Sequence, residues 1–312
     1  MKKNIEDIAK WLKDYCEKGG FKGYVLGLSG GIDSAVSLGL AVTAVGPERV
    51  RCLALPCAIE GENSRSEDID HAFLVAKRFG VKCDIKNLGF TAQALYNTIE
   101  NPTKLVLPNI KARLRMVTLR AEAEALGYLV LGTTNKTEEY LGYYTKAGDG
   151  GAGVDIEPIA DFFKFEIRML AKELGVPEEI INKKPSAGLW FDQTDEDEIG
   201  FSYDDIDKYL KIREDLVTYS SALIHYYITK SILNGDRSVK WMNISSYMKG
   251  NLKVRSEKID EKLIDRVENM IVAGNHKRNN PPSFNRDYFS KPDYKEYFKG
   301  EDNLFNRKKE VK

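Results

Sequence analysis

The segment Ser29-Gly30-Gly31-Ile32-Asp33-Ser34 stands between an apolar run and an apolar helical stretch. Glycines let backbone N–H groups come close to an anion, and the start of the following helix adds N–H donors and partial positive charge. Ser29 and Ser34 add hydroxyl donors, so the segment is typical of a pyrophosphate-binding loop. It lacks the Walker pattern GxxxxGK[ST] and therefore the P-loop lysine.

Asp33 is a carboxylate in a loop that is otherwise suited to phosphate. It would repel such a ligand unless a cation lay between them, which favours Mg²⁺ bridging Asp33 and phosphate oxygens. The alternative is a glycine-rich turn in which Asp33 caps the following helix.

The elements around this loop alternate between strands and helices. Short apolar runs predict the strands, and longer stretches with apolar residues at helical spacing predict the helices. The predicted strands are 23–29, 50–56, 81–88 and 128–133, and the predicted helices are 4–18, 35–46, 64–79, 109–126 and 164–174. This order indicates an α/β fold, a doubly wound parallel sheet with helices on both faces, followed by a mostly helical C-terminal part.

Ligands of such sheets bind beyond the carboxyl ends of the strands, where the strand order reverses. Ser29, Pro56 and Thr133 end three predicted strands, so we expect the site beside them. Thr133 is placed to donate to a nucleotide, and Glu138 offers a second carboxylate for Mg²⁺. The Gly- and Asp-rich stretch 141–160 is predicted to be an ordered loop of the kind that usually serves function.

Composition excludes several classes of protein. The 312 residues are 42% hydrophobic and 30% charged, which is typical of a globular chain, and 47 basic residues balance 47 acidic ones. The net charge of zero therefore does not favour binding to nucleic acid or to an anionic membrane. No apolar run approaches the roughly 20 residues of a membrane span, and the first residues do not resemble a secretory signal. Four cysteines without a C-x-x-C pair predict buried free thiols in a reducing cytoplasm.

The SGGxDS loop is shared by the ATP pyrophosphatase superfamily, whose members split ATP between the α and β phosphates and adenylate a carbonyl oxygen. Further motifs narrow the resemblance. They are NIKARLRM (109–116), GTTNKTE (132–138), GYYTKAGDGG (142–151), PSAGL (185–189), the acidic stretch 195–207 and HKR (276–278). In this order, from about residue 5 to 281, they resemble the NAD synthetase family.

The resemblance implies the conversion of deamido-NAD to NAD with ATP and a nitrogen donor, in a homodimer. It implies one domain over 1–281, with 282–312 as an arm or tail. The ATP ligands that it implies are Gly27, Leu28, Ser29, Gly30, Gly31, Ile32, Asp33, Ser34, Thr133, Lys164 and Ser186. It also implies Mg²⁺ on Asp33 and Glu138. The implied deamido-NAD contacts are Arg113, Lys146, Asp155, His276 and Lys277.

The chemistry expected from this resemblance has two steps. The nicotinate carboxylate attacks the α-phosphorus of ATP and releases pyrophosphate, with Lys164 and Mg²⁺ neutralising the leaving group. Ammonia then displaces AMP from the acyl-adenylate, and no covalent nucleophile of the protein is needed. An acidic side chain within 149–155 or 192–198 would take a proton from ammonium, and the sequence does not choose one. Because the nucleotide loop begins at residue 29, we expect no N-terminal glutaminase domain and read the nitrogen donor as free ammonia.

Three alternatives remain open. They are another adenylating ATP pyrophosphatase such as a tRNA-thiolating enzyme, a synthetase subunit fed by a separate glutaminase, and a non-catalytic nucleotide-binding module. The chain also departs from the family pattern. Ala54 stands where ammonia-using members often have arginine, and Arg51 or Arg65 is expected to compensate.

Two further positions stay unresolved at this stage. GDGGAGVD is two residues longer than the common GDGGxD, so either Asp149 or Asp155 faces the substrate. Arg113 and Arg115 lie two residues apart on a predicted helix and diverge by about 200°. One of them can reach the site while the other binds elsewhere.

Overall fold

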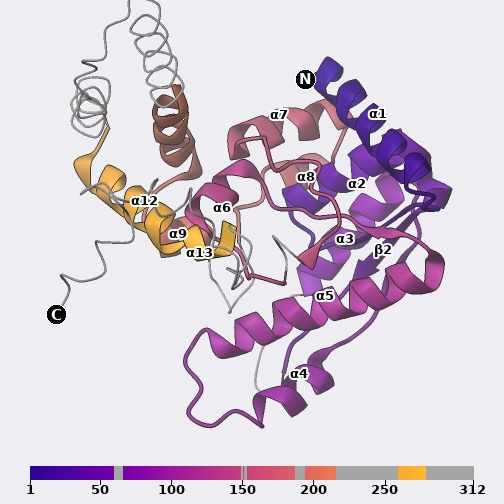
Figure 1. Ribbon diagram of the computed structural model, residues 1–312, viewed down its shortest axis with the longest axis horizontal. Helices are drawn as coiled ribbons and strands as arrows, with labels where there is room; N and C mark the ends of the chain where they lie inside the picture. Colours follow the sequence, from indigo (N-terminus) through magenta and orange to yellow (C-terminus); the bar gives the residue numbers. More distant parts are fainter. Residues whose placement is uncertain (60–65, 149, 151–152, 187–193, 216–258, 279–312) are drawn as a thin grey trace, which may run out of the picture. The chain divides into compact units, whose positions relative to one another are not determined.

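The computed structural model of the chain (Figure 1) describes residues 1–59, 66–148, 150, 153–186, 194–215 and 259–278. The described residues form one compact unit, Met1–Arg278. The expected boundary near 281 and the arm or tail 282–312 lie outside the described residues.

Within the described residues, four parallel strands form a sheet in the order β3-β2-β1-β4. The strands are β1 (Tyr24–Gly27), β2 (Val50–Ala54), β3 (Cys83–Ile85) and β4 (Leu129–Val130). Tyr24 is in register with Val50 on one side and with Leu129 on the other. From β1 the chain adds β2 and β3 on one side of that strand, and it then places β4 on the other side. This reversal confirms the predicted doubly wound sheet and places its switch point between β1 and β4.

Helices cover both faces of the sheet, and the alternation of side chains along β1 explains why. Tyr24 and Leu26 belong to the larger core, in which α1 (Lys2–Lys18), α2 (Ile32–Val45), α3 (Ser66–Arg78) and α7 (Lys164–Leu174) pack. Val25 faces the opposite way and packs with Leu119 and Ala123 of α5 (Val106–Leu126). Figure 1 shows α1, α2 and α7 on one side of the sheet and α5 on the other.

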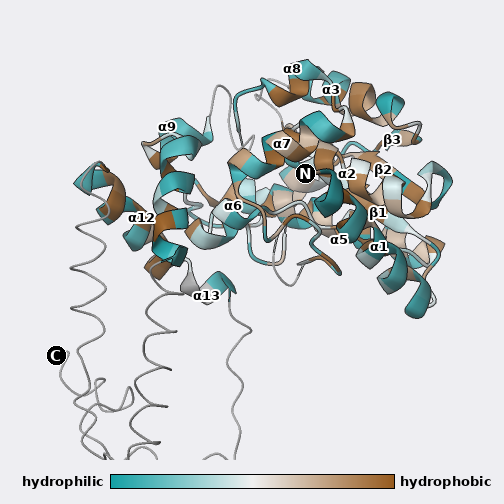
Figure 2. Cartoon of the chain, turned by 90° about the horizontal axis from the view of Figure 1, so that it is seen from above, coloured by the Kyte–Doolittle hydropathy of each residue, from teal (hydrophilic) through white to brown (hydrophobic). Residues whose placement is uncertain are grey.

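The outer and inner helices of the larger core differ in their patterning. The α1 helix buries Ile5, Ala9, Leu12 and Cys16 and is otherwise mostly hydrophilic (Figure 2). The α2 helix lies between α1 and α7 and is buried almost all round. A helix that is apolar on every side is typical of such a central position.

Several elements differ from the predicted bounds. The α7 helix coincides with the predicted 164–174, whereas β3 comprises only Cys83–Ile85 of the predicted 81–88. The sequence patterns missed α4 (Gly89–Tyr96), α6 (Lys136–Leu141), α8 (Glu178–Ile181) and α9 (Asp195–Ile199). Each has eight residues or fewer, which is too short for a clear apolar period.

A second apolar cluster follows the sheet. The helical residues 203–215 contribute Tyr203, Ile206, Tyr209 and Leu210, and α12 (Glu261–Ala273) contributes Leu263 and Val267. This cluster reaches Leu141 of α6 and Phe163 at the start of α7. It therefore buttresses two elements that, as shown below, carry site residues. The short α13 (Asn275–Arg278) ends the described chain.

Among the described residues, no helix combines the length and the apolar character that crossing a bilayer requires. All four cysteines are free thiols, and Cys16, Cys52 and Cys57 are buried.

Candidate active site

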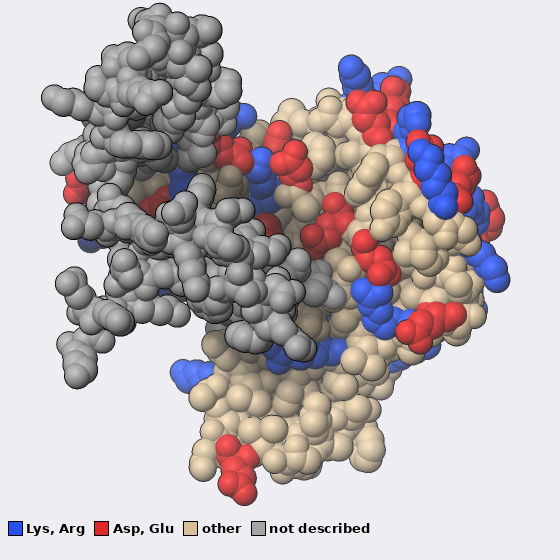
Figure 3. Space-filling view, in the orientation of Figure 1, with Lys and Arg blue, Asp and Glu red and all other residues tan. Residues whose placement is uncertain are grey.

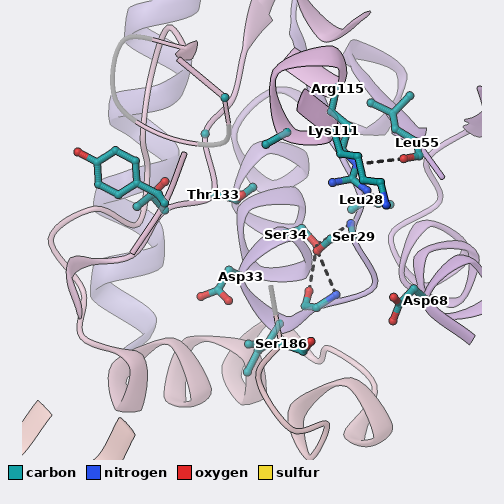
Figure 4. A pocket seen from close by; sticks show the side chains of 18 of the residues that line it. Leu28, Ser29, Asp33, Ser34, Leu55, Asp68, Lys111, Arg115, Thr133 and Ser186 are labelled. Carbon is teal, nitrogen blue, oxygen red and sulfur yellow. Dashed lines mark hydrogen bonds between the residues drawn. The ribbon is translucent and has the colours of Figure 1, made fainter. Parts of the chain in front are cut away.

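The loop 29–34 joins β1 to α2 and is held by its own hydroxyl groups. Ser34 Oγ donates to the Gly31 carbonyl at 3.0 Å, and it lies 3.2 Å from Ser29 Oγ (Figure 4). Gly30 has φ +75°, and a Cβ there would lie 2.4 Å from the Asp68 carbonyl oxygen. The loop conformation and this close approach both require glycine. Gly31, rather than Asp33, is the N-cap of α2, so the capping alternative for Asp33 is wrong.

Lys164 lies in a cluster of carboxylates beside this loop. Its Nζ is 2.6 Å from Asp33 Oδ2 and 3.1 Å from Glu138 Oε1, and its side chain is 3% exposed. Asn135 caps α6, with Glu138 as its capping-box partner, and the Asn135 amide also donates to Asp33 at 2.9 Å. The start of α6 therefore fixes Asn135 and Glu138 together, against Asp33.

In this cluster, burial and the neighbouring charges shift pKa values in opposite directions. Burial raises the pKa of Glu138 to about 8, although the Lys164 ammonium opposes the shift. Burial also acts to lower the pKa of Lys164, but attraction from Asp33 and Glu138 outweighs it and leaves that pKa above its usual value. Lys164 therefore stays an ammonium group at neutral pH.

Two tyrosines extend the cluster. Lys164 Nζ lies 4.9 Å from the centre of the Tyr203 ring. The Tyr203 hydroxyl donates to the buried Asp195 at 3.2 Å, and the Tyr143 hydroxyl is 3.4 Å from the same carboxylate. Asp195 is thus a third carboxylate near Lys164, and it comes from the 192–198 stretch that the sequence singled out.

These groups line a cavity of about 570 Å³ at the carboxyl ends of β1, β2 and β4. The predicted ATP ligands that line it are Gly27, Leu28, Ser29, Gly31, Ile32, Asp33, Ser34, Thr133, Lys164 and Ser186, and Glu138 joins them. Gly30 contributes backbone to the same loop. The segments that form this wall are scattered along the sequence and meet where the strand order reverses.

Sequence reasoning assigned no role to several other residues of this cavity. They are Asp68, Lys111, Lys183 and Lys184. The N-x-x-E capping pattern of Asn135 and Glu138 was a readable signal for α6. Asp68 and Lys183 carried no comparable signal, because they meet only in the folded chain.

Of the two arginines on α5, Arg115 reaches the cavity and donates to the Leu55 carbonyl at 3.0 Å (Figure 4). Arg113 is exposed and is not among the residues that line this cavity. Arg51 pairs with Asp84 and Glu122 instead of compensating for Ala54 in the cavity. Arg65 lies outside the described residues.

The other expected deamido-NAD ligands lie outside the cavity wall. Lys146 is half-buried in the loop 142–148. Lys277 donates to the Gly142 and Tyr144 carbonyls at 2.7 and 2.6 Å. Asp155 accepts from Arg120 at 2.5 Å and from the Val130 N–H at 2.7 Å. Asp155 therefore anchors its loop to β4.

Two of the expected residues cannot be compared in this way. His276 belongs to α13, and its side chain is not among the described ones. Asp149 lies outside the described residues, so its competition with Asp155 for the substrate stays a prediction.

The carboxylates fit a magnesium ion. Asp33 and Glu138 touch the same ammonium nitrogen, so their oxygens are close enough to share one cation. Within the described residues, no group of three or more side chains forms a complete metal site. Mg²⁺ usually takes one or two carboxylates and completes its shell with water and substrate phosphates, and Asp33 and Glu138 supply that number of carboxylates.

Comparison with known proteins agrees with this geometry. A family model described as NAD synthase matches residues 4–232. The NH(3)-dependent NAD(+) synthetase of Finegoldia magna is 44% identical over 209 residues, which are 67% of this chain and 83% of that protein. The corresponding protein of Pyrococcus horikoshii is 36% identical over 291 residues, which are 90% of this chain and 95% of that protein.

Solved structures give the same result. NMN synthetase from Francisella tularensis superposes with a TM-score of 0.69 at 30% identity, over 91% of this chain and 98% of that one. NH3-dependent NAD synthetase from Campylobacter jejuni, in complex with the nitrate ion, gives 0.65 at 25% identity, over the same shares of both chains. With the phosphate loop, the carboxylate pair and the fold all in agreement, this chain belongs to the NAD synthase family.

Proposed function

We propose that the chain is a carbon–nitrogen ligase that converts deamido-NAD to NAD with ATP and ammonia, and releases AMP and pyrophosphate. The observation that carries the proposal is the buried Lys164 ammonium between Asp33 and Glu138, in a cavity that also contains the loop 29–34. That arrangement suits a triphosphate and its metal ion. The related synthetases supply the rest of the chemistry.

The first step forms a bond between a nicotinate carboxylate oxygen and the α-phosphorus, and breaks the bond from that phosphorus to the bridging oxygen. The electron pair leaves on pyrophosphate. Lys164 neutralises negative charge that develops there, and the loop N–H groups hold the phosphates in line. Mg²⁺, held by Asp33 and Glu138, would supply further charge neutralisation when bound.

In the second step, ammonia attacks the acyl carbon of the adenylate and AMP departs with the electron pair of the acyl–oxygen bond. The attacking nitrogen then loses a proton. Asp195 is the described carboxylate of the 192–198 stretch that lines the cavity next to Lys164, so it is the proton acceptor that the geometry favours. No group of the protein becomes covalently bound to substrate.

Substrate recognition follows the same division. The loop 29–34, Thr133, Lys164 and Ser186 are proposed to hold ATP, because they line the cavity. Arg113, Lys146, His276 and Lys277 are proposed to receive deamido-NAD from outside it. Asp155 would hold the loop that carries Lys146, through its contacts with Arg120 and Val130.

Two properties of the whole molecule complete the proposal, a homodimer and a cytoplasmic location. Exposed apolar side chains lie around α4 and α5: Phe90 is 89% exposed, Leu105 53% and Val117 65%. Such a surface supports contact with a second copy of the chain there. The apolar helix 35–46 does not provide that surface, because α2 is buried in the chain's own core. On the described part of the face in Figure 3, basic and acidic side chains are interspersed.

The proposal is tested by supplying purified protein with ATP, Mg²⁺, deamido-NAD and ammonium chloride. We expect NAD, AMP and pyrophosphate in equal amounts, and no NAD from glutamine that is free of ammonium. The apparent Michaelis constant for total ammonium should fall as pH rises, because neutral ammonia is the nucleophile. A rate with glutamine equal to that with ammonium would reject ammonia as the sole donor.

A parallel reaction contains nicotinate mononucleotide in place of deamido-NAD, since one structural relative is an NMN synthetase. Faster amidation of the mononucleotide would replace the proposed substrate and leave the ligase chemistry standing. Absence of pyrophosphate release with either acceptor would refute the ligase function.

A further inference from the structure

A second lysine–carboxylate pair lines the cavity, apart from the Lys164 cluster. Lys183 Nζ donates to Asp68 Oδ1 at 2.6 Å and lies 2.9 Å from His71 Nδ1. Asp68 and Lys183 both line the cavity, whereas His71 lies behind them, 8% exposed. Asp68 and His71 belong to α3, and Lys183 belongs to the segment that leads to Ser186. Nothing in the proposed reaction has used this pair.

The histidine is set to hold the lysine. An ammonium group only donates, so His71 Nδ1 must accept and its proton must lie on Nε2. His71 Nε2 faces Glu179 Oε1 at 3.1 Å, so Glu179 can accept that proton's hydrogen bond, whereas Glu67 Oε1 at 3.7 Å is too far to do so. The tautomer that Glu179 favours is therefore the one that binds Lys183.

The pair lies directly against the phosphate loop. The Asp68 carbonyl oxygen approaches Gly30 so closely that a Cβ there would lie only 2.4 Å from it. In Figure 4, Ser29 and Ser34 lie between Asp33 on one side and Asp68 on the other. Lys164 accompanies Asp33, and Lys183 accompanies Asp68. An ATP phosphate chain on this loop would thus lie between two ammonium groups.

We infer that Lys183, held in place by Asp68 and His71, is a second phosphate ligand of the cavity and binds the β and γ phosphates that leave as pyrophosphate. The inference rests on the proposed function for its ligand. Within the described residues, two of the three N–H donors of Lys183 are directed at Asp68 and His71. The third N–H group would donate to a phosphate oxygen.

The electrostatics favour a ligand over a simple link between two segments. Asp68 alone would place a carboxylate beside a loop that binds phosphate, and Lys183 cancels that repulsion. Both side chains keep partial exposure, 22% for Lys183 and 30% for Asp68, so an anion in the cavity can reach the ammonium group. Lys183 therefore offers positive charge on the wall of a phosphate cavity.

Product inhibition separates this role from a structural one. As products of the proposed reaction, pyrophosphate and AMP are each expected to inhibit it, but only pyrophosphate would contact Lys183. We expect Lys183→Met to weaken pyrophosphate inhibition and raise the Michaelis constant for ATP by about tenfold or more, which is the effect of losing one charge-assisted hydrogen bond. The inhibition constant of AMP should change less than twofold, which corresponds to about 0.4 kcal/mol of binding free energy.

Two variants and one control sharpen the result. Lys183→Arg keeps the charge and should retain part of the pyrophosphate inhibition. His71→Gln should reproduce a smaller part of the Lys183→Met effect in the same parameter, because it acts through the lysine. Lys77→Met changes an exposed lysine on α3 and should match the wild-type protein. Equal loss of pyrophosphate and AMP inhibition in Lys183→Met would overturn the inference.

Direct binding keeps the two proposals distinguishable. Calorimetry with magnesium pyrophosphate needs no turnover and is run on wild-type, Lys183→Met and Lys183→Arg proteins. If wild-type protein makes no NAD but Lys183→Met still loses pyrophosphate affinity, the proposed function fails and the phosphate ligand stands. If wild-type protein makes NAD and both variants bind pyrophosphate as it does, Lys183 is not a phosphate ligand. If Lys183→Met does not fold, the Lys183→Arg, His71→Gln and wild-type affinities decide in the same way.

Discussion

Lys164 Nζ lies 2.6 Å from Asp33 Oδ2, although 131 residues separate the two along the chain. Glu138 approaches the same nitrogen from α6 at 3.1 Å. One ammonium group thus joins the phosphate loop, the segment after β4 and the first turn of α7. The consequences of this relationship are measurable in activity and in stability.

Replacing either carboxylate should abolish NAD synthesis while preserving the fold. We expect Asp33→Asn and Glu138→Gln to lower kcat by about 100-fold or more, the scale of losing a group that stabilises developing charge. Asp161→Asn, which changes an exposed carboxylate paired with Lys136, is the control. Near-wild-type turnover of Asp33→Asn at saturating Mg²⁺ would remove Asp33 from the metal site.

Removing the lysine should cost stability as well as activity. Lys164→Met removes the buried ammonium that pairs with Asp33 and Glu138, and losing one partner of a buried ion pair costs about 3–5 kcal/mol. Urea unfolding at neutral pH measures the loss, with Lys172→Met on the exposed side of α7 as the control. A variant within about 1 kcal/mol of wild type would show that the cluster does not depend on this charge.

Asp207 should make stability depend on pH. Burial raises the pKa of Asp207 to about 6, against hydrogen bonds from Thr137 and the Phe165 N–H that act to lower it. The folded carboxyl therefore keeps a proton that the unfolded chain, with a pKa of 3.8, has released. Stability from this group is present below pH 3.8 and is lost as pH rises to about 6.

The measurement compares wild-type protein with Asp207→Asn between pH 4 and 7. The free energy of unfolding of wild type, relative to the variant, should fall by up to about 3 kcal/mol across the window and then level off. Asp265→Asn, an exposed position on α12, should leave the pH profile unchanged. A difference that rises with pH instead would mean that hydrogen bonding to the carboxylate outweighs its burial.

Light scattering should give about twice the chain mass of 35.3 kDa. Phe90→Glu and Val117→Glu would place charges on the exposed apolar surface of α4 and α5 and should shift the mass toward a single chain. Val272→Glu is the matched control, since Val272 is 73% exposed on α12. A wild-type mass near 35.3 kDa at micromolar concentration and above would contradict a dimer.

Local signals account for the parts of the fold that sequence predicted. The buried runs of β1 and β2 and the amphipathic pattern of α7 depend on neighbours along the chain, so their periods are readable. The capping pattern of Asn135 and Glu138 spans only four residues and was equally readable, although α6 was not predicted from it. The doubly wound parallel sheet with helices on both faces followed from the alternation of strands and helices.

Contacts between distant segments explain what the sequence did not predict. Lys183 meets Asp68 across 115 residues, and no local pattern links them. Asp155 resembled a substrate ligand by its motif, yet β4 and Arg120 engage its oxygens. The apolar pattern of 35–46 did not show what covers the helix, and only the packing of α1 and α7 shows that it is interior.

The separation between Asp33 and Lys164 also orders events during protein synthesis. The phosphate loop leaves the ribosome 131 residues before its lysine. At bacterial and eukaryotic elongation speeds of about 5–20 residues per second, that interval is roughly 7 to 26 seconds. For that time the nascent chain contains Asp33 without its ammonium partner, and Glu138 joins it only 26 residues before Lys164. A nascent chain shorter than 164 residues should therefore be unable to retain ATP. ATP binding would then occur only after more than half of the chain has been synthesised.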